Sequence, residues 1–485
     1  MNWGALAKLF GFFSCIIAAL IGCSALVCLL MDEPEAWRLG LSALIPLVGG
    51  VALMQISWHE DIEDLSHREA CLLIAFTWPL AIFWGAYPYL FSGIFGDYSF
   101  GAYLNSLFES TAGFTATASS VVLPMVDFEK LCHGLLFWRS LSQWLGGLGI
   151  ILIALLFLPF IHSGGMELFQ TGSIARDRLR TRAGETPKLV VWIYIGLTVF
   201  CFGALKLAGM DFFDAICHAF TTVSAGGFST HNGNIAYYYS SPVEIILILF
   251  MLLSTTNFVL HFSFARGEWG AYFRSAEFRF YIFLLSLAVG LIYWNLRVSG
   301  VPATLQSVIF NTVSSGSTTG FWTTDVSLWP SFSRAFLLLL MFTGGMVGST
   351  AGGIKCFRII ILFRYAYRQV FRIIHPSGFT PVKVEKRVVE REVLEGLTAF
   401  FFIYITIFGI GSMILQACGY EMLVAASAAA SALGGVGPGF GQMGADGGFF
   451  NVPMAGKITL MSLMLLGRVE IFPILVILSK EFWRK

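Results

Sequence analysis

The chain has 485 residues, of which 56% are hydrophobic and only 12% are charged, and its formal net charge is +1. This balance argues against a nucleic-acid-binding protein and predicts an all-α polytopic membrane protein embedded in a lipid bilayer. The nine cysteines lie mostly in apolar runs and form no CxxC pair. We therefore interpret them as buried small side chains rather than as disulfides or metal ligands.

Two apolar segments, 6–30 and 39–57, come first along the chain. Residues 1–69 are predicted to form two extra N-terminal transmembrane helices, the first of them retained rather than cleaved as a signal peptide. Four tandem repeats follow, each with the order span, re-entrant pore helix, filter segment, span, around one central pore. We place these repeats at 70–187, 188–277, 278–393 and 394–485, with pore helices at 100–110, 212–223, 303–315 and 422–433.

A short motif follows each predicted pore helix. It reads STAGF at 110–114, SAGGF at 224–228, STTGF at 317–321 and, in degenerate form, GGVGP at 434–438. Non-helical backbone at membrane depth is tolerated where protein buries it or where it lines a watery cavity, so four copies predict a ring of carbonyl groups around one ion path. A single such glycine would more simply indicate close helix packing. The predicted filter residues are Thr111, Ala112, Gly113, Ala225, Gly226, Gly227, Thr318, Thr319, Gly320, Gly435, Val436 and Gly437.

The stretch 344–355 has five glycines among twelve residues and lies inside the second span of the third repeat. Such a density of glycine predicts a break in the helix. The alternative is a tight helix crossing built from small residues. The residues concerned are Gly344, Gly345, Gly348, Ser349, Thr350, Gly352 and Gly353.

Arg468 places a full charge in the last span, at a cost of at least ~2.5 kcal/mol, which marks it as a functional candidate. It either lines a cavity below the stretch 344–355, where it bonds carbonyl groups of that stretch and repels cations, or forms a structural ion pair with a distant acid. Asn257, in the second span of the second repeat, is predicted to line the cavity or to join neighbouring helices.

Basic residues gather in the loops 162–188, 266–279 and 355–391, which ten spans would place on one side of the membrane. Lys and Arg are enriched in cytoplasmic loops, so this side is predicted to be cytoplasmic. Both termini are then cytoplasmic, and the filter segments enter the membrane from the outside.

The order of these features resembles the bacterial TrkH potassium-uptake proteins of the Trk/Ktr/HKT superfamily. The resemblance covers essentially the whole chain, including the stretch 344–355 and the span of Arg468, although Pro438 stands where the first three motifs have Phe. It implies a gated potassium-conducting subunit of the bacterial inner membrane, with K⁺ as the transported ion and no bound organic cofactor. The implied potassium positions are Thr111, Gly113, Gly227, Thr318, Gly320 and Gly437.

The resemblance also implies that the stretch 344–355 is an intramembrane gating loop below the filter. It further implies a homodimer that stands on a cytosolic ring of nucleotide-binding TrkA-type subunits. The alternative function is a secondary-active K⁺ symporter coupled to H⁺ or Na⁺, which would be expected to show inverted repeats and ionisable residues at the midplane. No nucleophile, metal cluster or acid–base pair stands out within the spans, so the chain is predicted not to be an enzyme.

Overall fold

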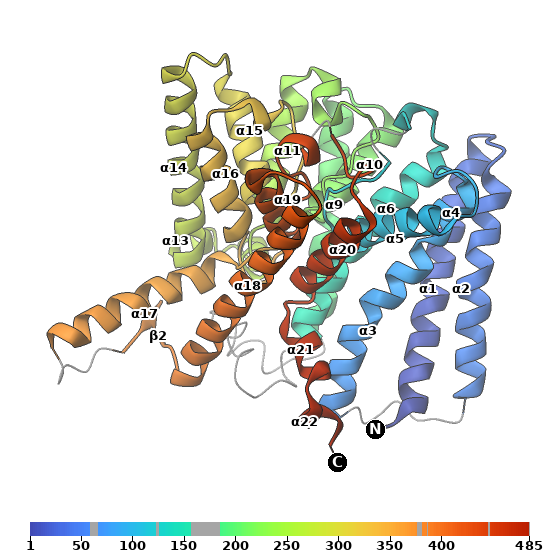
Figure 1. The fold of residues 1–485 in the computed structure, drawn as a ribbon, viewed down its shortest axis with the longest axis horizontal. Helices are drawn as coiled ribbons and strands as arrows, with labels where there is room; N and C mark the ends of the chain where they lie inside the picture. The colour runs from blue at the N-terminus through green and yellow to red at the C-terminus, as the bar shows by residue number, and fades with distance from the viewer. Residues whose placement is uncertain are drawn as a thin grey trace.

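The computed structural model describes residues 1–58, 66–122, 126–156, 185–375, 381–385, 387–444 and 447–484. These residues are mainly helical, and β1 (Lys383–Val384) pairs with β2 (Arg387–Val388) in a short antiparallel hairpin. The helices form one bundle with both chain termini at the same end (Figure 1). There the ring of Trp3 stacks on the ring of Trp483. The prediction of an all-α fold is confirmed.

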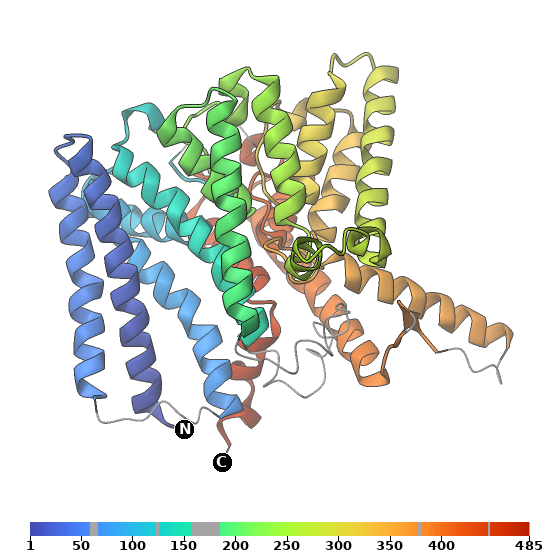
Figure 2. The same ribbon diagram turned by 180° about the vertical axis from the view of Figure 1, so that it is seen from behind.

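The first two helices, α1 (Trp3–Leu30) and α2 (Ala36–Ile56), form an antiparallel pair at one edge of the bundle (Figure 2). Glycines allow their backbones to touch: a Cβ on Gly11 would lie 2.7 Å from the carbonyl oxygen of Gly50, and the reverse distance is the same. Neither helix is followed by a pore helix. The pair therefore stands outside the repeats.

Four repeats of span, pore helix and span follow along the chain. The first contains α3 (His67–Gly85), α4 (Tyr87–Ser92), the pore helix α5 (Phe100–Phe114) and α6 (His133–Leu156). The second contains α9 (Glu185–Leu207), the pore helix α10 (Phe212–Val223), α11 (Ser241–Ser254), α12 (Phe258–Ala265) and α13 (Ala271–Arg274). The third contains α14 (Ala276–Val298), the pore helix α15 (Leu305–Gly316), α16 (Ser331–Thr343) and α17 (Cys356–Ile374). The fourth contains α18 (Arg391–Ala417), the pore helix α19 (Met422–Gly434), α20 (Met454–Arg468), α21 (Phe472–Leu478) and α22 (Lys480–Trp483).

Among the described residues, six helical segments are long and apolar enough to cross a membrane, and two bent helix pairs bring the number to eight. The bent pairs are α11–α12, at 100°, and α20–α21, at 108°. The sequence predicts single spans at 243–264 and 457–478, so the structure differs by dividing each of them. The side chain of Asn257 explains the first break, because its Oδ1 accepts a hydrogen bond from the Val259 amide and caps α12.

The second span of the third repeat is divided as well. After the glycine-rich stretch, α17 leaves the line of α16 and projects sideways from the bundle (Figures 1 and 2). The predicted span at 335–371 is therefore one short apolar helix followed by a break and a lateral helix. Most of the basic loop at 162–188 lies outside the described residues, because the structure describes nothing between 156 and 185.

Candidate functional site

Three of the four predicted filter segments lie together at the carboxyl ends of their pore helices. A Cβ on Gly227 would lie 1.9 Å from the carbonyl oxygen of Thr319, and a Cβ on Gly320 would lie 2.0 Å from that of Val436. The φ angles of Gly227, Gly320 and Gly437 are 76°, 82° and 121°. Glycine is required at these positions both by the left-handed backbone and by the close approach of the neighbouring segment.

The first predicted segment is placed differently by the structure. Thr111, Ala112 and Gly113 lie inside the helix α5, so the prediction that they form a non-helical segment in register with the other three is wrong. Gly113 serves helix packing instead, because a Cβ there would lie 2.4 Å from the Ser142 Oγ of α6. The motif at 110–114 therefore lies five residues before the segment that joins the other three.

The segment that completes the ring is 115–119, which reads TATAS. Thr115 caps α5, Ala116 has a φ of 50°, and Ala118 takes the position of the filter glycines. Cβ atoms built on Gly227, Gly320 and Gly437 would lie 2.9, 2.7 and 2.4 Å from the Ala118 Cβ. The sequence interpretation missed this segment because it searched for a motif that contains glycine. The signal that could have found the segment is the run of small residues, TATAS, directly after the helix.

Polar side chains behind the ring hold the first two segments. The Gln143 Nε2 donates to the Gly226 carbonyl at 2.8 Å, and its Oε1 accepts from the Phe228 amide at 3.0 Å. Arg139 and Glu109 form a buried ion pair at 2.9 Å. Glu109 also accepts from the Val121 amide at 3.0 Å, so its carboxylate fixes the exit of the first segment.

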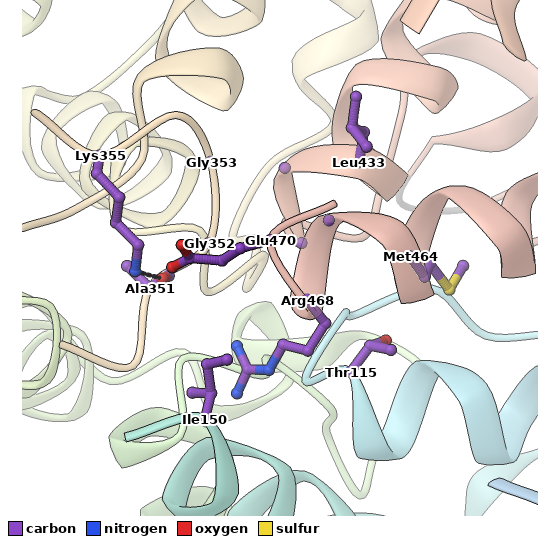
Figure 3. A pocket seen from close by; sticks show the side chains of 13 residues that line it. Thr115, Ile150, Ala351, Gly352, Gly353, Lys355, Leu433, Met464, Arg468 and Glu470 are labelled. Carbon is purple, nitrogen blue, oxygen red and sulfur yellow. Dashed lines mark hydrogen bonds between the residues drawn. The ribbon is translucent and has the colours of Figure 1, made fainter. Parts of the chain in front are cut away.

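Small cavities lie on both faces of the ring. The outer cavity, of about 40 Å³, is bordered by Ala118, Gly227 and Gly320. The inner cavity, of about 20 Å³, is bordered by Thr115, Gly434 and Gly435 of the ring and by residues of the glycine-rich stretch and α20 (Figure 3). A volume of this size holds about one water molecule. The path below the ring is therefore nearly filled by protein.

The glycine-rich stretch 344–355 is non-helical and borders the inner cavity. Its amide groups find partners on neighbouring elements: Met346 donates to the Thr255 carbonyl at 3.0 Å, and Gly352 donates to the Thr318 Oγ1 at 2.9 Å. A Cβ on Gly352 would lie 2.1 Å from the Gly434 carbonyl oxygen. The stretch thus contacts the third predicted filter segment directly and the end of the fourth pore helix.

Arg468 ends α20 and is 7% exposed. Its Nη1 donates to the Thr350 carbonyl at 3.0 Å, and its Nη2 donates to the Gly146 carbonyl at 2.8 Å. Glu470 pairs with Arg358 instead, at 2.5 Å. Of the two predicted roles of Arg468, these contacts favour the one in which it bonds the glycine-rich stretch.

Glu277 is a further residue at this site, and the sequence interpretation missed it. It is 3% exposed, and its Oε1 accepts from the Val347 amide at 2.8 Å and from the Phe357 amide at 3.1 Å. One carboxylate oxygen thereby holds the middle of the glycine-rich stretch and the start of α17. An acidic residue in the first turn of a helix is common, so its sequence position carried no specific signal.

Four pore helices that aim at one ring, with a cavity on each face, define a membrane transport protein with a repeated pore-forming unit. The sequence model of the TrkH family, described as a cation transport protein, matches residues 92–485, and the chain belongs to this family. It is similar to the Trk system potassium uptake protein TrkH of Escherichia coli K12, at 34% identity over the full length of both chains. The Trk system potassium uptake protein TrkI of Halomonas elongata is 33% identical, with 100% of this chain and 98% of that protein covered. The crystal structure of the potassium transporter TrkH from Vibrio parahaemolyticus matches over the full length of both chains with a TM-score of 0.89 and 31% sequence identity.

Proposed function

We propose that the chain is the gated potassium-conducting subunit of a Trk-type uptake system. Potassium would pass between the segments 115–118, 225–227, 318–320 and 435–437, bound by backbone carbonyl groups in place of its water shell. The observation that carries this proposal is the convergence of Ala118 with the three filter glycines. The names of the full-length relatives supply the identity of the ion.

Helix ends support a cation path through this ring. The helices α5 and α19 end beside the inner cavity, which both Thr115 and Gly434 border. The carboxyl end of a helix carries a partial negative charge of about half an elementary charge. A potassium ion leaving the ring would therefore be stabilised below it, before it reaches the glycine-rich stretch.

We propose that the stretch 344–355 is the gate. It borders the inner cavity below the ring, and hydrogen bonds hold it there: Thr318, Glu277 and Arg468 bond its backbone groups. Ser254, Thr255 and Phe258, beside the break between α11 and α12, bond it as well. Opening of the gate would exchange these bonds. A channel of this kind would dissipate the membrane potential unless a partner controlled it. We assign that control to cytosolic nucleotide-binding subunits of the TrkA type, below a homodimer of this chain in the bacterial inner membrane.

In the topology that we propose, both termini and α17 lie on the cytoplasmic side. The helix α17 carries Arg364, Arg368 and Arg372, and it projects from the bundle where a cytosolic ring could reach it. Movement of α17 would pull directly on the stretch 344–355, because the two are continuous in sequence. The partner is therefore expected to act through this helix.

Deletion of residues 345–352 tests the proposed gate. The two residues that flank the deletion, Gly344 and Gly353, are already in contact, since a Cβ on Gly353 would lie 2.8 Å from the Cα of Gly344. The remaining chain can thus be joined without moving α16 or α17. We expect higher potassium flux into liposomes without any partner, and flux that does not respond to the ring or its nucleotide. A folded deletion variant with parental flux would place the gate elsewhere.

Conduction and symport are separated by measuring potassium flux of the purified protein with and without a gradient of H⁺ or Na⁺. A conducting pore moves potassium according to its own electrochemical gradient alone. Uptake against that gradient, driven by H⁺ or Na⁺, would instead establish the symporter. The deletion variant serves as the control, because an open pore cannot accumulate potassium against its gradient.

A further inference from the structure

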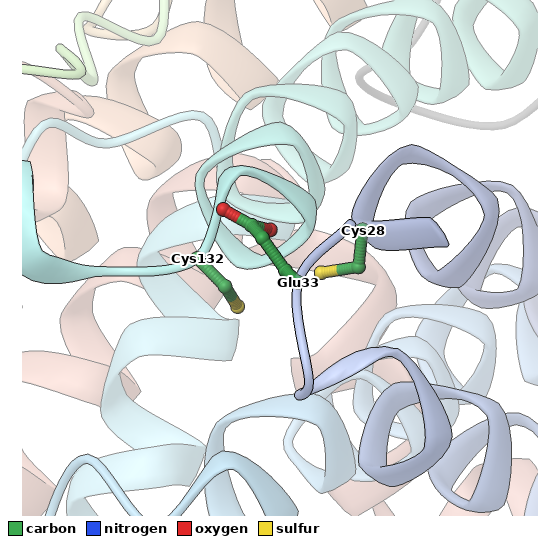
Figure 4. Close-up of side chains that lie close together, drawn as sticks. All are labelled: Cys28, Glu33 and Cys132. Atoms are coloured by element: carbon green, nitrogen blue, oxygen red, sulfur yellow. The ribbon is translucent and has the colours of Figure 1, made fainter. Parts of the chain in front are cut away.

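A separate cluster of side chains that can bind a metal lies between the N-terminal helix pair and the first repeat. Cys28 belongs to the last turn of α1, Glu33 lies in the turn before α2, and Cys132 directly precedes α6. One ligand atom from each, the two thiol sulfurs and a carboxylate oxygen, lie within 4.8 Å of one another (Figure 4). The turn between α1 and α2 is at the end of the bundle opposite the two termini (Figure 2).

The carboxylate of Glu33 is held in place by the residue after Cys132. The amide of His133 donates to both carboxylate oxygens at 2.9 Å, and the His133 Nδ1 lies 2.7 Å from Oε1. Metal-binding carboxylates are commonly fixed by such outer hydrogen bonds. The orientation of the Glu33 carboxylate is therefore fixed without a bound ion.

A glycine sets the distance between the two cysteines. A Cβ on Gly134 would lie 2.4 Å from the Cys28 Sγ and 2.4 Å from the Ser24 carbonyl oxygen. The start of α6 can approach α1 this closely only because Gly134 has no side chain. Cys132, two residues earlier, is thereby brought to Cys28 although 103 residues separate them in sequence.

We propose that Cys28, Glu33 and Cys132 bind a zinc ion that clamps the N-terminal helix pair to the first repeat. Two sulfurs and one carboxylate oxygen are a ligand set suited to Zn²⁺, and a water molecule can complete four-coordination. Bonds of about 2.0–2.3 Å place tetrahedral ligand atoms about 3.3–3.8 Å apart, so the cluster must close by no more than about 1 Å. Both thiols release their protons to water when the ion binds, and no electron is transferred. The site is independent of the potassium path.

The test uses the full-length protein in detergent with a metal-free reducing agent, which keeps the thiols reduced. After incubation with ZnCl₂ and removal of free metal, the parent is expected to hold about one zinc ion per chain by elemental analysis. Cys132→Ser should hold at least tenfold less. Cys23→Ser is the matched control, because Cys23 is exposed on the same helix and should leave the zinc content unchanged. Equal zinc in the parent and in Cys132→Ser would overturn the proposal.

Cobalt substitution of the parent tests sulfur ligation without any variant. Co²⁺ bound by two thiolates gives a strong sulfur-to-metal charge-transfer absorption, which added Zn²⁺ should remove. Absence of this absorption would overturn the site even if zinc were retained elsewhere. A Cys28–Cys132 disulfide, found by mass spectrometry in protein taken from membranes without reductant, would equally overturn it, because the thiolates would not be available.

Discussion

A Cβ placed on Gly437 would lie 2.4 Å from the methyl carbon of Ala118, so the segments 115–119 and 435–437 meet with no room for a second side chain. Ala118 N also donates to the Val436 carbonyl at 3.3 Å, which confirms that the two segments are direct neighbours. Ala118 does not have a positive φ. Alanine is therefore tolerated at position 118 without backbone strain, whereas Gly227, Gly320 and Gly437 have positive φ and need to be glycine.

The methyl group of Ala118 is predicted to limit the width of the filter. Ala118→Gly should raise potassium flux several-fold and change the ratio of potassium to sodium permeability, because one methyl group leaves the point where four segments meet. Ala118→Val should lower the flux at least tenfold. Bi-ionic reversal potentials and liposome flux measure both effects.

Gly113→Ala is the control for this prediction. Its new methyl group would press on the Ser142 Oγ inside the helix pair α5–α6, so thermal stability should fall while the permeability ratio stays parental. If the ratio of potassium to sodium permeability changed in Gly113→Ala and stayed parental in Ala118→Gly, the first filter segment would be 111–113 instead.

Gly320→Ala is expected to abolish potassium flux. A left-handed backbone costs alanine about 1–2 kcal/mol, and its Cβ would lie 2.0 Å from the Val436 carbonyl oxygen, so the ring must open or distort. Gly196→Ala is the matched control: this glycine lies in α9, and apart from the local backbone of that helix and the adjoining residues no atom lies within 4 Å of its added Cβ. The control should keep full flux, and helix propensity would add up to about 1 kcal/mol of stability. Full flux in Gly320→Ala would remove the third segment from the filter.

Arg468→Ala is expected to raise partner-free potassium flux several-fold. The substitution removes a buried positive charge from the inner cavity and frees the Thr350 carbonyl of the glycine-rich stretch. Arg468→Lys keeps the charge while losing one of the two carbonyl bonds, so its flux should lie between those of the parent and the alanine variant. Parental flux in Arg468→Ala, together with a lower unfolding temperature, would indicate a purely structural role.

Glu277→Ala is expected to loosen the glycine-rich stretch 344–355, which we propose is the gate. It leaves the buried amides of Val347 and Phe357 without their acceptor, at about 1–3 kcal/mol for each unpaired group. Hydrogen exchange at residues 345–357 should accelerate, and partner-free flux should rise. Glu277→Gln keeps an acceptor oxygen in place and should exchange more slowly than the alanine variant. If exchange and flux in Glu277→Ala both match the parent, Glu277 does not hold the gate.

The sequence determined the membrane class, the repeats and the elements that build the pore. Hydrophobic length and glycine-rich motifs are local properties, so the pore helix at 212–223 could be predicted to the residue, and α15 and α19 to within two residues at either end. The break at 344–355 was predictable for the same reason, because glycine density acts on the helix that contains it. Arg468 stood out because a charge in an apolar span is costly wherever its partner lies.

Only the tertiary structure decided which residues of other segments these elements contact. The first filter segment was misplaced because a glycine that packs two helices and a glycine that lines a pore look alike in sequence; the contacts of Gly113 and Ala118 distinguish them. Glu277 and the Cys28–Cys132 pair gave no local signal, since their partners lie many residues away and come together only through helix packing. Periodicity and composition describe what a segment is, whereas burial and hydrogen bonding depend on which other segment approaches it.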